Sequence, residues 1–204
     1  MTTANKVTII RIALVPVFVV SILYYFRKYD PASPETAEIY RWTAIAAFLL
    51  ATVSDFVDGW LARNRNQQTK LGSYLDPIAD KLLLISGLVL LAIPLKTQPF
   101  GEPLPYWFVG IVFGRDLIVV AGATLVYLTI GDLTVRPHIL SKISSVLQMV
   151  CIGWMLFKFT PVVTFWLVIG ASVTTAITGV IYVMDGIRQF SEHPVAHPEK
   201  KDES

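Results

Sequence analysis

Apolar residues form six long runs along the 204-residue chain, and short polar segments with proline or glycine separate them. Each run approaches the roughly 20 residues that an α-helix needs to cross the hydrocarbon core of a bilayer. The pattern predicts an all-α integral membrane protein, a bundle of six transmembrane helices with a polar cavity open to the cytoplasm. We expect the spans near Val7–Phe26, Tyr40–Trp60, Leu75–Leu95, Trp107–Ile130, Ile143–Phe159 and Val162–Met184.

Composition agrees with a membrane protein. Hydrophobic residues make up 54% of the chain and charged residues only 16%, and the mean hydropathy is +0.58; soluble domains are far more polar. We find neither an internal repeat nor a long linker, so residues 1–188 are predicted to form one membrane domain. Residues 189–204 are polar and contain two prolines, which is typical of a disordered cytoplasmic tail.

Basic residues predict the orientation. Six spans place both ends of the chain on one side, and cytoplasmic loops carry an excess of Lys and Arg. The side of the termini would hold nine of these residues: Lys6, Arg63, Arg65, Lys70, Arg136, Lys142, Arg188, Lys200 and Lys201. The other side would hold Arg27, Lys28, Arg41, Lys96 and Lys158. We therefore expect a multi-pass membrane protein whose termini, and with them the segment from Asp55 to Asp80, face the cytoplasm. The net charge of +2 is too small to indicate a nucleic-acid partner.

Four aspartates stand at helical spacing where the second predicted span ends and the third begins. Asp55 and Asp58 are three residues apart, and Asp76 and Asp80 are four apart, so each pair shares one face of its helix. Carboxylates at the edge of a bilayer are costly unless they face a cavity and have partners. Oxygen ligands favour magnesium, manganese or calcium over zinc. The pattern predicts a cage for two cations, which could stabilise a pyrophosphate during in-line displacement.

Other residues of the same segment suit a phosphate ligand. Gly59 and Gly72 lack side chains where a nucleotide or phosphate would approach the backbone. Arg63 follows Gly59 by one helical turn and can form paired hydrogen bonds to phosphate oxygens.

The segment from Asp55 to Asp80 resembles the signature of the CDP-alcohol phosphatidyltransferase family, D-x2-D-G-x2-A-R-x8-G-x3-D-x3-D, at every fixed position. The resemblance implies transfer of a phosphatidyl group from CDP-diacylglycerol to a hydroxyl with release of CMP. It implies two Mg²⁺ or Mn²⁺ ions on Asp55, Asp58, Asp76 and Asp80, with Asp80 also the general base. A CDP site formed by Asp58, Gly59, Ala62, Arg63 and Gly72 follows in the same way. Members of this family are commonly homodimers.

The acceptor alcohol is indicated by weaker matches. The N-terminal segment with Asn5, Thr8 and Arg11, followed by Pro16 and Phe18, is similar to the bacterial phosphatidylglycerophosphate synthases of the family. This similarity implies glycerol 3-phosphate as acceptor, with its phosphate bound by the cations of Arg115, Arg136 and Lys142. The alternatives are phosphatidylglycerol, as in cardiolipin synthesis, and an inositol phosphate; serine would make poorer use of these cations.

Several of these residues also have simpler interpretations. Arg115 and Asp116 could form an ion pair that holds helices together, and Arg136 could serve only to orient the chain. Thr8 and Arg11 would edge the mouth of the site, or Arg11 would extend its charged end to the membrane surface. A cation transporter with the four carboxylates along an ion path is the non-enzymatic alternative. It does not account for Arg63, nor for carboxylates gathered near one face.

Overall fold

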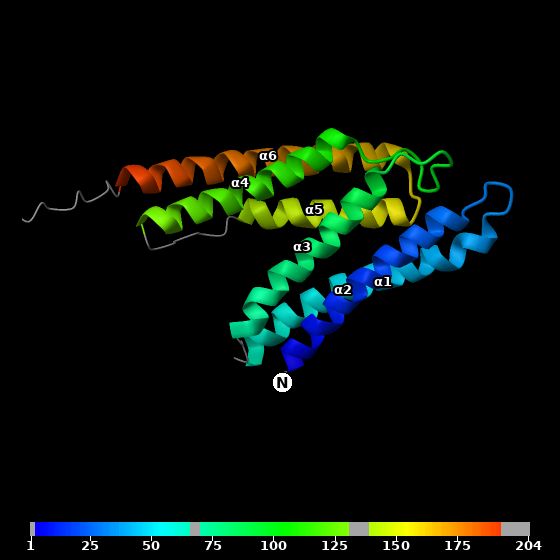
Figure 1. The fold of residues 1–204 in the computed structure, drawn as a ribbon, viewed down its shortest axis with the longest axis horizontal. Helices are drawn as coiled ribbons and strands as arrows, with labels where there is room; N and C mark the ends of the chain where they lie inside the picture. The colour runs from blue at the N-terminus through cyan, green and yellow to red at the C-terminus, as the bar shows by residue number, and fades with distance from the viewer. Residues whose placement is uncertain (1–2, 66–69, 131–138, 193–204) are drawn as a thin grey trace, which may run out of the picture. The chain divides into compact units, whose positions relative to one another are not determined.

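The structure is a computed structural model in which the backbone is described for residues 3–65, 70–130 and 139–192, and the side chains for 9–54, 78–125, 128 and 139–188. The described residues form six helices and no strand, which confirms the all-α class (Figure 1). Each helix contains most of one predicted span. The helices are α1 (Thr3–Lys28), α2 (Glu35–Arg65), α3 (Lys70–Ala92), α4 (Tyr106–Ile130), α5 (Ile139–Leu156) and α6 (Pro161–Glu192).

Two helices end earlier than the hydropathy pattern predicts. α3 ends at Ala92 because Pro94 disfavours helical geometry in the residue before it. α5 ends at Leu156, where Lys158 adopts a φ of 57°. The amide of Lys158 donates to the carbonyl of Met155 and that of Phe159 to Trp154, at 2.9 and 3.2 Å. This is a Schellman motif, which satisfies the last carbonyls of the helix although no glycine is present.

Four helices are long and apolar enough to cross a bilayer, which supports a multi-pass membrane protein. Their candidate spans are Ile9–Lys28, Tyr106–Leu125, Ile139–Leu156 and Pro161–Arg188. Among the residues with described side chains, α2 and α3 yield no such span. In α2 the first turns carry Glu35, Glu38 and Arg41, and α3 carries Asp80 and Lys81. The two remaining spans therefore stay predictions, as does the polar cavity.

The chain divides into two compact units. The first contains residues 1–109 and 148–168, and the second contains residues 110–147 and 169–204. In the first unit α1 packs on both α2 and α3, and α2 also contacts α3. Phe18 of α1 and Phe48 of α2 are buried with their ring centroids 5.8 Å apart. The motif-bearing helices are thus held together by α1.

Close packing in the first unit depends on one glycine. A Cβ atom at Gly87 of α3 would lie 2.8 Å from Cδ1 of Ile152 in α5. Such a distance is shorter than a van der Waals contact, so these helices approach each other only because position 87 has no side chain. Small residues at helix contacts are a general feature of membrane proteins, where packing contributes more than exclusion of water.

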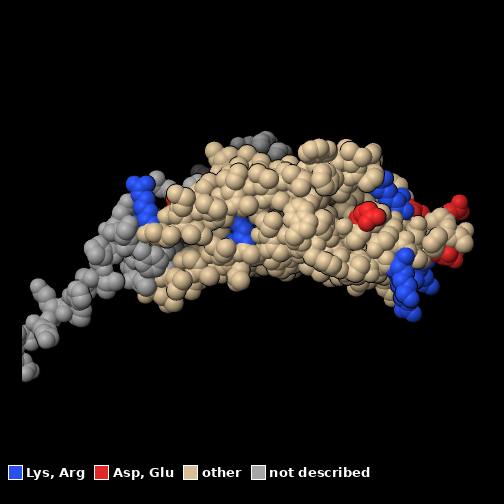
Figure 2. Space-filling model, turned by 90° about the horizontal axis from the view of Figure 1, so that it is seen from above, with Lys and Arg blue, Asp and Glu red and all other residues tan. Residues whose placement is uncertain are grey.

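Much of the apolar surface faces outward. In the second unit Leu117, Val120 and Leu128 of α4 and Ile187 of α6 are all exposed. Most of the described surface in the view of Figure 2 carries neither acidic nor basic side chains. Patches of this kind are rare on soluble monomers. The surface is therefore the one expected of helices that contact lipid.

Candidate active site

The four aspartates of the motif lie on two helices that contact each other. α2 includes Asp55 and Asp58, and α3 includes Asp76 and Asp80. The predicted helical spacing of each pair is therefore confirmed. Only the side chain of Asp80 belongs to the described residues. The side chains of Asp55, Asp58, Asp76, Gly59, Ala62, Arg63 and Gly72 lie outside them, so the cation cage and the CDP site stay predictions.

Asp80 is in contact with the N-terminal helix. Nη1 of Arg11 donates a hydrogen bond of 3.0 Å to Oδ1 of Asp80. The Arg11 side chain is 0% exposed, whereas that of Asp80 is 32% exposed. The ion pair thus joins a fully buried guanidinium to a partly exposed carboxylate.

The burial of Arg11 corrects one interpretation and supports another. A snorkelling arginine would carry its charged end to the membrane surface, but Arg11 is covered by protein. A buried guanidinium is tolerated only with a paired anion and further hydrogen bonds, since desolvation is costly. Arg11 is instead in the immediate surroundings of Asp80, in agreement with a place beside the predicted site. Two features of the sequence indicated such a place: the match of the N-terminal segment with Arg11, and a charged residue in the third turn of an apolar helix.

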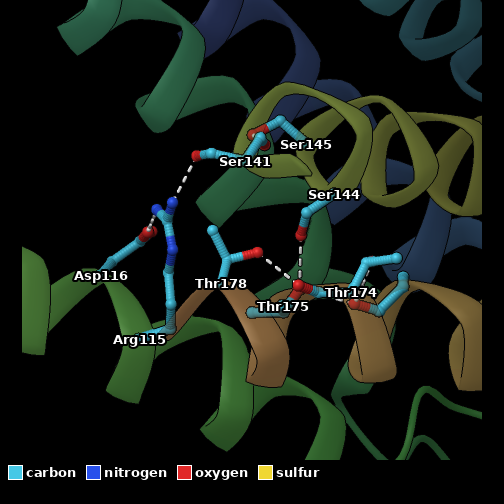
Figure 3. A network of polar contacts seen from close by, with 9 residues as sticks. Arg115, Asp116, Ser141, Ser144, Ser145, Thr174, Thr175 and Thr178 are labelled. Carbon is cyan, nitrogen blue, oxygen red and sulfur yellow. Dashed lines mark hydrogen bonds and ion pairs between the residues drawn. The ribbon is translucent and has the colours of Figure 1, made fainter. Parts of the chain in front are cut away.

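Arg115 joins three helices of the second unit (Figure 3). Its guanidinium donates to Oδ1 of Asp116 at 2.8 Å, donates to Oγ of Ser141 in α5, and lies 5.1 Å from the centroid of the Tyr182 ring in α6. The predicted ion pair with Asp116 is confirmed. This ion pair does not connect helices, because both residues belong to α4. The contacts of Arg115 with Ser141 and Tyr182 connect α4 to α5 and α6.

A seam of buried hydroxyl groups continues from this arginine. Ser144 of α5 and Thr175 of α6 share a hydrogen bond of 2.6 Å, and the Thr175 hydroxyl also donates to the carbonyl of Ala171 (Figure 3). The hydroxyl groups of Thr174 and Thr178 likewise donate hydrogen bonds to backbone carbonyls one turn earlier in α6. Sequence reasoning missed the seam, although its Ser and Thr residues recur at helical spacing. It fixes the packing of α5 on α6 beside Arg115.

Of the other two cations predicted for the acceptor, the structure describes Lys142. Lys142 is exposed on α5, directly after the serine that contacts Arg115. Arg136 lies outside the described residues. The structure thus shows Lys142 exposed on α5, and its place in the acceptor site stays a prediction.

A second charged cluster lies in the first unit, on α2 and the segment after α5. Nε of Arg41 donates to Glu38 at 2.6 Å, Nζ of Lys158 donates to Glu38 at 3.1 Å, and Arg41 also donates to the carbonyl of Leu156. Burial acts to raise the pKa of Glu38, but hydrogen bonds and charges of Arg41 and Lys158 outweigh burial and lower it below its ordinary value. This cluster contains none of the predicted site residues, and it anchors the end of α5 to α2.

A cavity of about 660 Å³ lies near the same cluster. Its lining comes from residues 99–107 and from residues 155–168, and it includes Trp107, Lys158 and Phe165. The lining is largely apolar and contains none of the predicted site residues. This cavity is therefore not the polar one that the sequence predicts.

The donor chemistry of the motif suits hard divalent cations. All four predicted ligands are carboxylates, and the one whose side chain is described is partly exposed beside a buried cation. Among the described side chains no three metal-ligating groups come together. The residues present thus fit Mg²⁺ or Mn²⁺ by chemical type, and their geometry around an ion stays a prediction.

Comparison with known proteins identifies the family. A profile of CDP-alcohol phosphatidyltransferases matches residues 1–177. A CDP-diacylglycerol–glycerol-3-phosphate 3-phosphatidyltransferase of Bacillus subtilis is 32% identical over 158 residues, which is 77% of each chain. A probable phosphatidylglycerophosphate synthase of Mycobacterium tuberculosis is 31% identical over 191 residues, 92% of this chain and 82% of the relative.

A third relative is named for a different product. The probable cardiolipin synthase (CMP-forming) of Drosophila melanogaster is 32% identical over 163 residues, 69% of this chain and 48% of the relative. The profile match and these identities show that the chain belongs to the CDP-alcohol phosphatidyltransferase family.

Membership settles the broad class. The protein is an enzyme, a phosphatidyltransferase of phospholipid biosynthesis, and the cation transporter is set aside. Enzymes of the family are generally metal-dependent. The resemblance that the motif indicated is confirmed.

Proposed function

We propose that this enzyme transfers the phosphatidyl group of CDP-diacylglycerol to the hydroxyl of glycerol 3-phosphate, which gives phosphatidylglycerophosphate and CMP. The observation that carries the proposal is the full signature on α2 and α3 in a chain whose bacterial relatives are named for this reaction. The apolar helices around the signature suit a donor whose acyl chains remain in the bilayer.

The proposed reaction is a direct displacement at the phosphorus that carries the diacylglycerol. A bond forms between that phosphorus and the acceptor oxygen, and the bond between the phosphorus and the CMP oxygen breaks. The hydroxyl proton passes to the carboxylate of Asp80, which is partly exposed and therefore within reach of an acceptor from solvent. No covalent enzyme intermediate is needed.

The donor side of the site rests on the motif. Asp55, Asp58, Asp76 and Asp80 would hold two Mg²⁺ or Mn²⁺ ions, which supply positive charge to the diphosphate when bound. Asp58, Gly59, Ala62, Arg63 and Gly72 would line the CDP moiety. In this arrangement Arg63 forms charge-assisted hydrogen bonds to phosphate oxygens.

The acceptor side rests on cations outside the motif. Lys142 is the strongest candidate for the acceptor phosphate because its side chain is exposed on α5. Arg115 is anchored by Asp116 and Ser141, so it would offer only part of its guanidinium to a phosphate. Arg136 is the third cation proposed for the acceptor phosphate, on the evidence of the sequence alone. We also propose a homodimer in the inner membrane with the motif facing the cytoplasm.

The second candidate function is cardiolipin synthesis of the CMP-forming type, with phosphatidylglycerol as acceptor. The relative from Drosophila melanogaster favours it. An inositol phosphate is a third acceptor of the same chemistry. A lipid acceptor would reach the site from the bilayer and would have no terminal phosphate for Lys142.

Product analysis with a panel of acceptors tests the proposal. Purified protein would be supplied with CDP-diacylglycerol, Mg²⁺ and one acceptor at a time: glycerol 3-phosphate, phosphatidylglycerol, an inositol phosphate or serine. We expect CMP release and phosphatidylglycerophosphate only with glycerol 3-phosphate. Cardiolipin formed from phosphatidylglycerol, without reaction of glycerol 3-phosphate, would replace the first proposal by the second.

A further inference from the structure

Arg11 lies outside the signature, yet it contacts the residue at the end of it. Its Nη1 is 3.0 Å from Oδ1 of Asp80, and the two residues are 69 positions apart in the sequence. The contact joins α1 to α3 within the first unit. None of the roles described above for the donor, the acceptor or the metal ions uses Arg11.

The two residues of the pair differ in burial, and this difference would let Arg11 hold a reactive carboxylate in place. Arg11 is fully enclosed, so its long side chain has little freedom to move, whereas about a third of the Asp80 side chain is exposed. A guanidinium has a planar, fixed set of donors and directs a carboxylate more strictly than an ammonium does. The contact of Arg11 with Oδ1 therefore restricts where the Asp80 carboxylate lies.

We propose that Arg11 is a positioning residue of the transfer reaction: its guanidinium holds the Asp80 carboxylate in the orientation that accepts the hydroxyl proton of the acceptor. This role rests on the proposed function, in which Asp80 is the base. A base displaced by about 1 Å from its productive position can cost on the order of a hundredfold in rate. Loss of Arg11 therefore affects turnover more than substrate binding.

The first experiment compares Arg11→Gln and Arg11→Lys with a matched variant, Arg41→Gln. Arg41 is also an ion-paired arginine of the first unit, but its partner is Glu38. On purified, folded protein we expect Arg11→Gln to lower kcat by about 10- to 100-fold. The KM values for both substrates should change by less than about threefold, because the interaction acts in the transition state. Arg41→Gln should lower thermal stability and leave kcat close to wild type.

Arg11→Lys addresses the possibility that the Gln variant does not fold. It keeps the positive charge that compensates Asp80 but lacks the planar, fixed set of donors of a guanidinium. We expect a folded protein whose kcat is still reduced by about tenfold. Wild-type kcat in Arg11→Lys would overturn the role of the guanidinium, as would a loss confined to KM in either variant.

The second experiment is a double-mutant cycle with Asp80→Asn. If Arg11 acts through Asp80, Arg11→Gln should cause no further loss of kcat in the Asp80→Asn protein. An equal loss in both backgrounds would show that Arg11 acts independently and would overturn the proposal. Activity of the wild-type protein with each acceptor distinguishes failure of this proposal from failure of the proposed function. If wild type prefers another acceptor, the cycle is run with that acceptor; if wild type transfers to none, both proposals fail.

Discussion

The guanidinium of Arg11 reaches the carboxylate of Asp80 from a fully buried position on α1, at 3.0 Å. The proposed base therefore belongs to a half-buried ion pair as well as to the signature. Removal of its carboxylate leaves the buried guanidinium of Arg11 poorly compensated and lowers stability. The ion pair therefore gives Asp80 a structural role in addition to the catalytic role that the resemblance implies.

Asp80→Asn should lower turnover by about a hundredfold or more, the usual contribution of a positioned acid or base. It should also lower the yield and thermal stability of the protein, because Arg11 loses its carboxylate partner. The measurement is kcat on the folded fraction together with thermal unfolding in detergent. Arg11→Met combined with Asp80→Asn should recover stability without recovering turnover. Near-normal turnover of Asp80→Asn would remove Asp80 from the role of base.

Chelation should abolish activity, and Mg²⁺ or Mn²⁺ should restore it, because carboxylate ligands suit these ions. Asp55→Ala, Asp58→Ala and Asp76→Ala should each remain inactive at ordinary metal concentrations. The measurement is CMP release as a function of metal concentration. A variant among the three with full activity and an unchanged metal dependence would contradict the two-ion cage.

Lys142→Ala should raise the KM for glycerol 3-phosphate and leave binding of CDP-diacylglycerol nearly unchanged. A lost charge-assisted contact of about 1.5–3 kcal/mol corresponds to a shift of roughly ten- to a hundredfold. Saturation curves for each substrate measure the effect. An unchanged curve for glycerol 3-phosphate would exclude Lys142 from the acceptor site.

Arg115→Ala should act differently from Lys142→Ala, because Arg115 also joins α4 to α5 and α6. We expect a lower yield of folded protein together with any change in the acceptor curve. Ser141→Ala is the control, because it removes one contact of the guanidinium and keeps its charge. If Arg115→Ala were as stable as wild type, the contacts with Ser141 and Tyr182 would not hold these helices together.

Glu38 should make folding stability depend on acid pH. The lowered pKa of Glu38 means that the folded protein binds this proton less tightly than the unfolded chain, whose value is near 4.5. Its contribution is thus fully present above pH 4.5 and is lost as the pH falls through the lower folded value. Glu38→Gln should be less stable than wild type at pH 7, and the difference should shrink below pH 4.5. Thermal unfolding at several pH values measures it; a constant difference would contradict the ion-pair network.

Gly87→Ala should destabilise the protein by about 1–3 kcal/mol, the usual cost of overpacking. The added Cβ would meet Ile152 at 2.8 Å. Gly122→Ala in α4 is the control, because no described atom lies within 4 Å of its Cβ position and alanine favours a helix. Ile152→Val should relieve part of the Gly87→Ala effect, since it removes the closest atom. Equal unfolding temperatures for the two glycine variants would exclude this close approach.

Hydropathy and spacing determined most of the architecture and of the chemistry. Runs of about 20 apolar residues must form helices in a bilayer, where every backbone amide needs a partner. The order of α1 to α6 and the helical placement of Asp55, Asp58, Asp76 and Asp80 therefore followed from local pattern alone. Local pattern also indicated the family, because its signature lies in a single continuous segment of the chain.

Tertiary structure decided the partners of the charged residues. Arg11 and Asp80 are 69 positions apart, and no local pattern indicates that α1 turns its third helical turn toward that carboxylate. The sequence left two interpretations of Arg11 open, the mouth of the site and the membrane surface, because hydropathy records how apolar a segment is and not which side chains face one another. The same reason explains why the contacts of Arg115 with Ser141 and Tyr182 and the packing of Gly87 on Ile152 were not predicted. The sequence alone thus determined the helices and the reaction class, and only the packing of the helices decided which residue holds the proposed base in place.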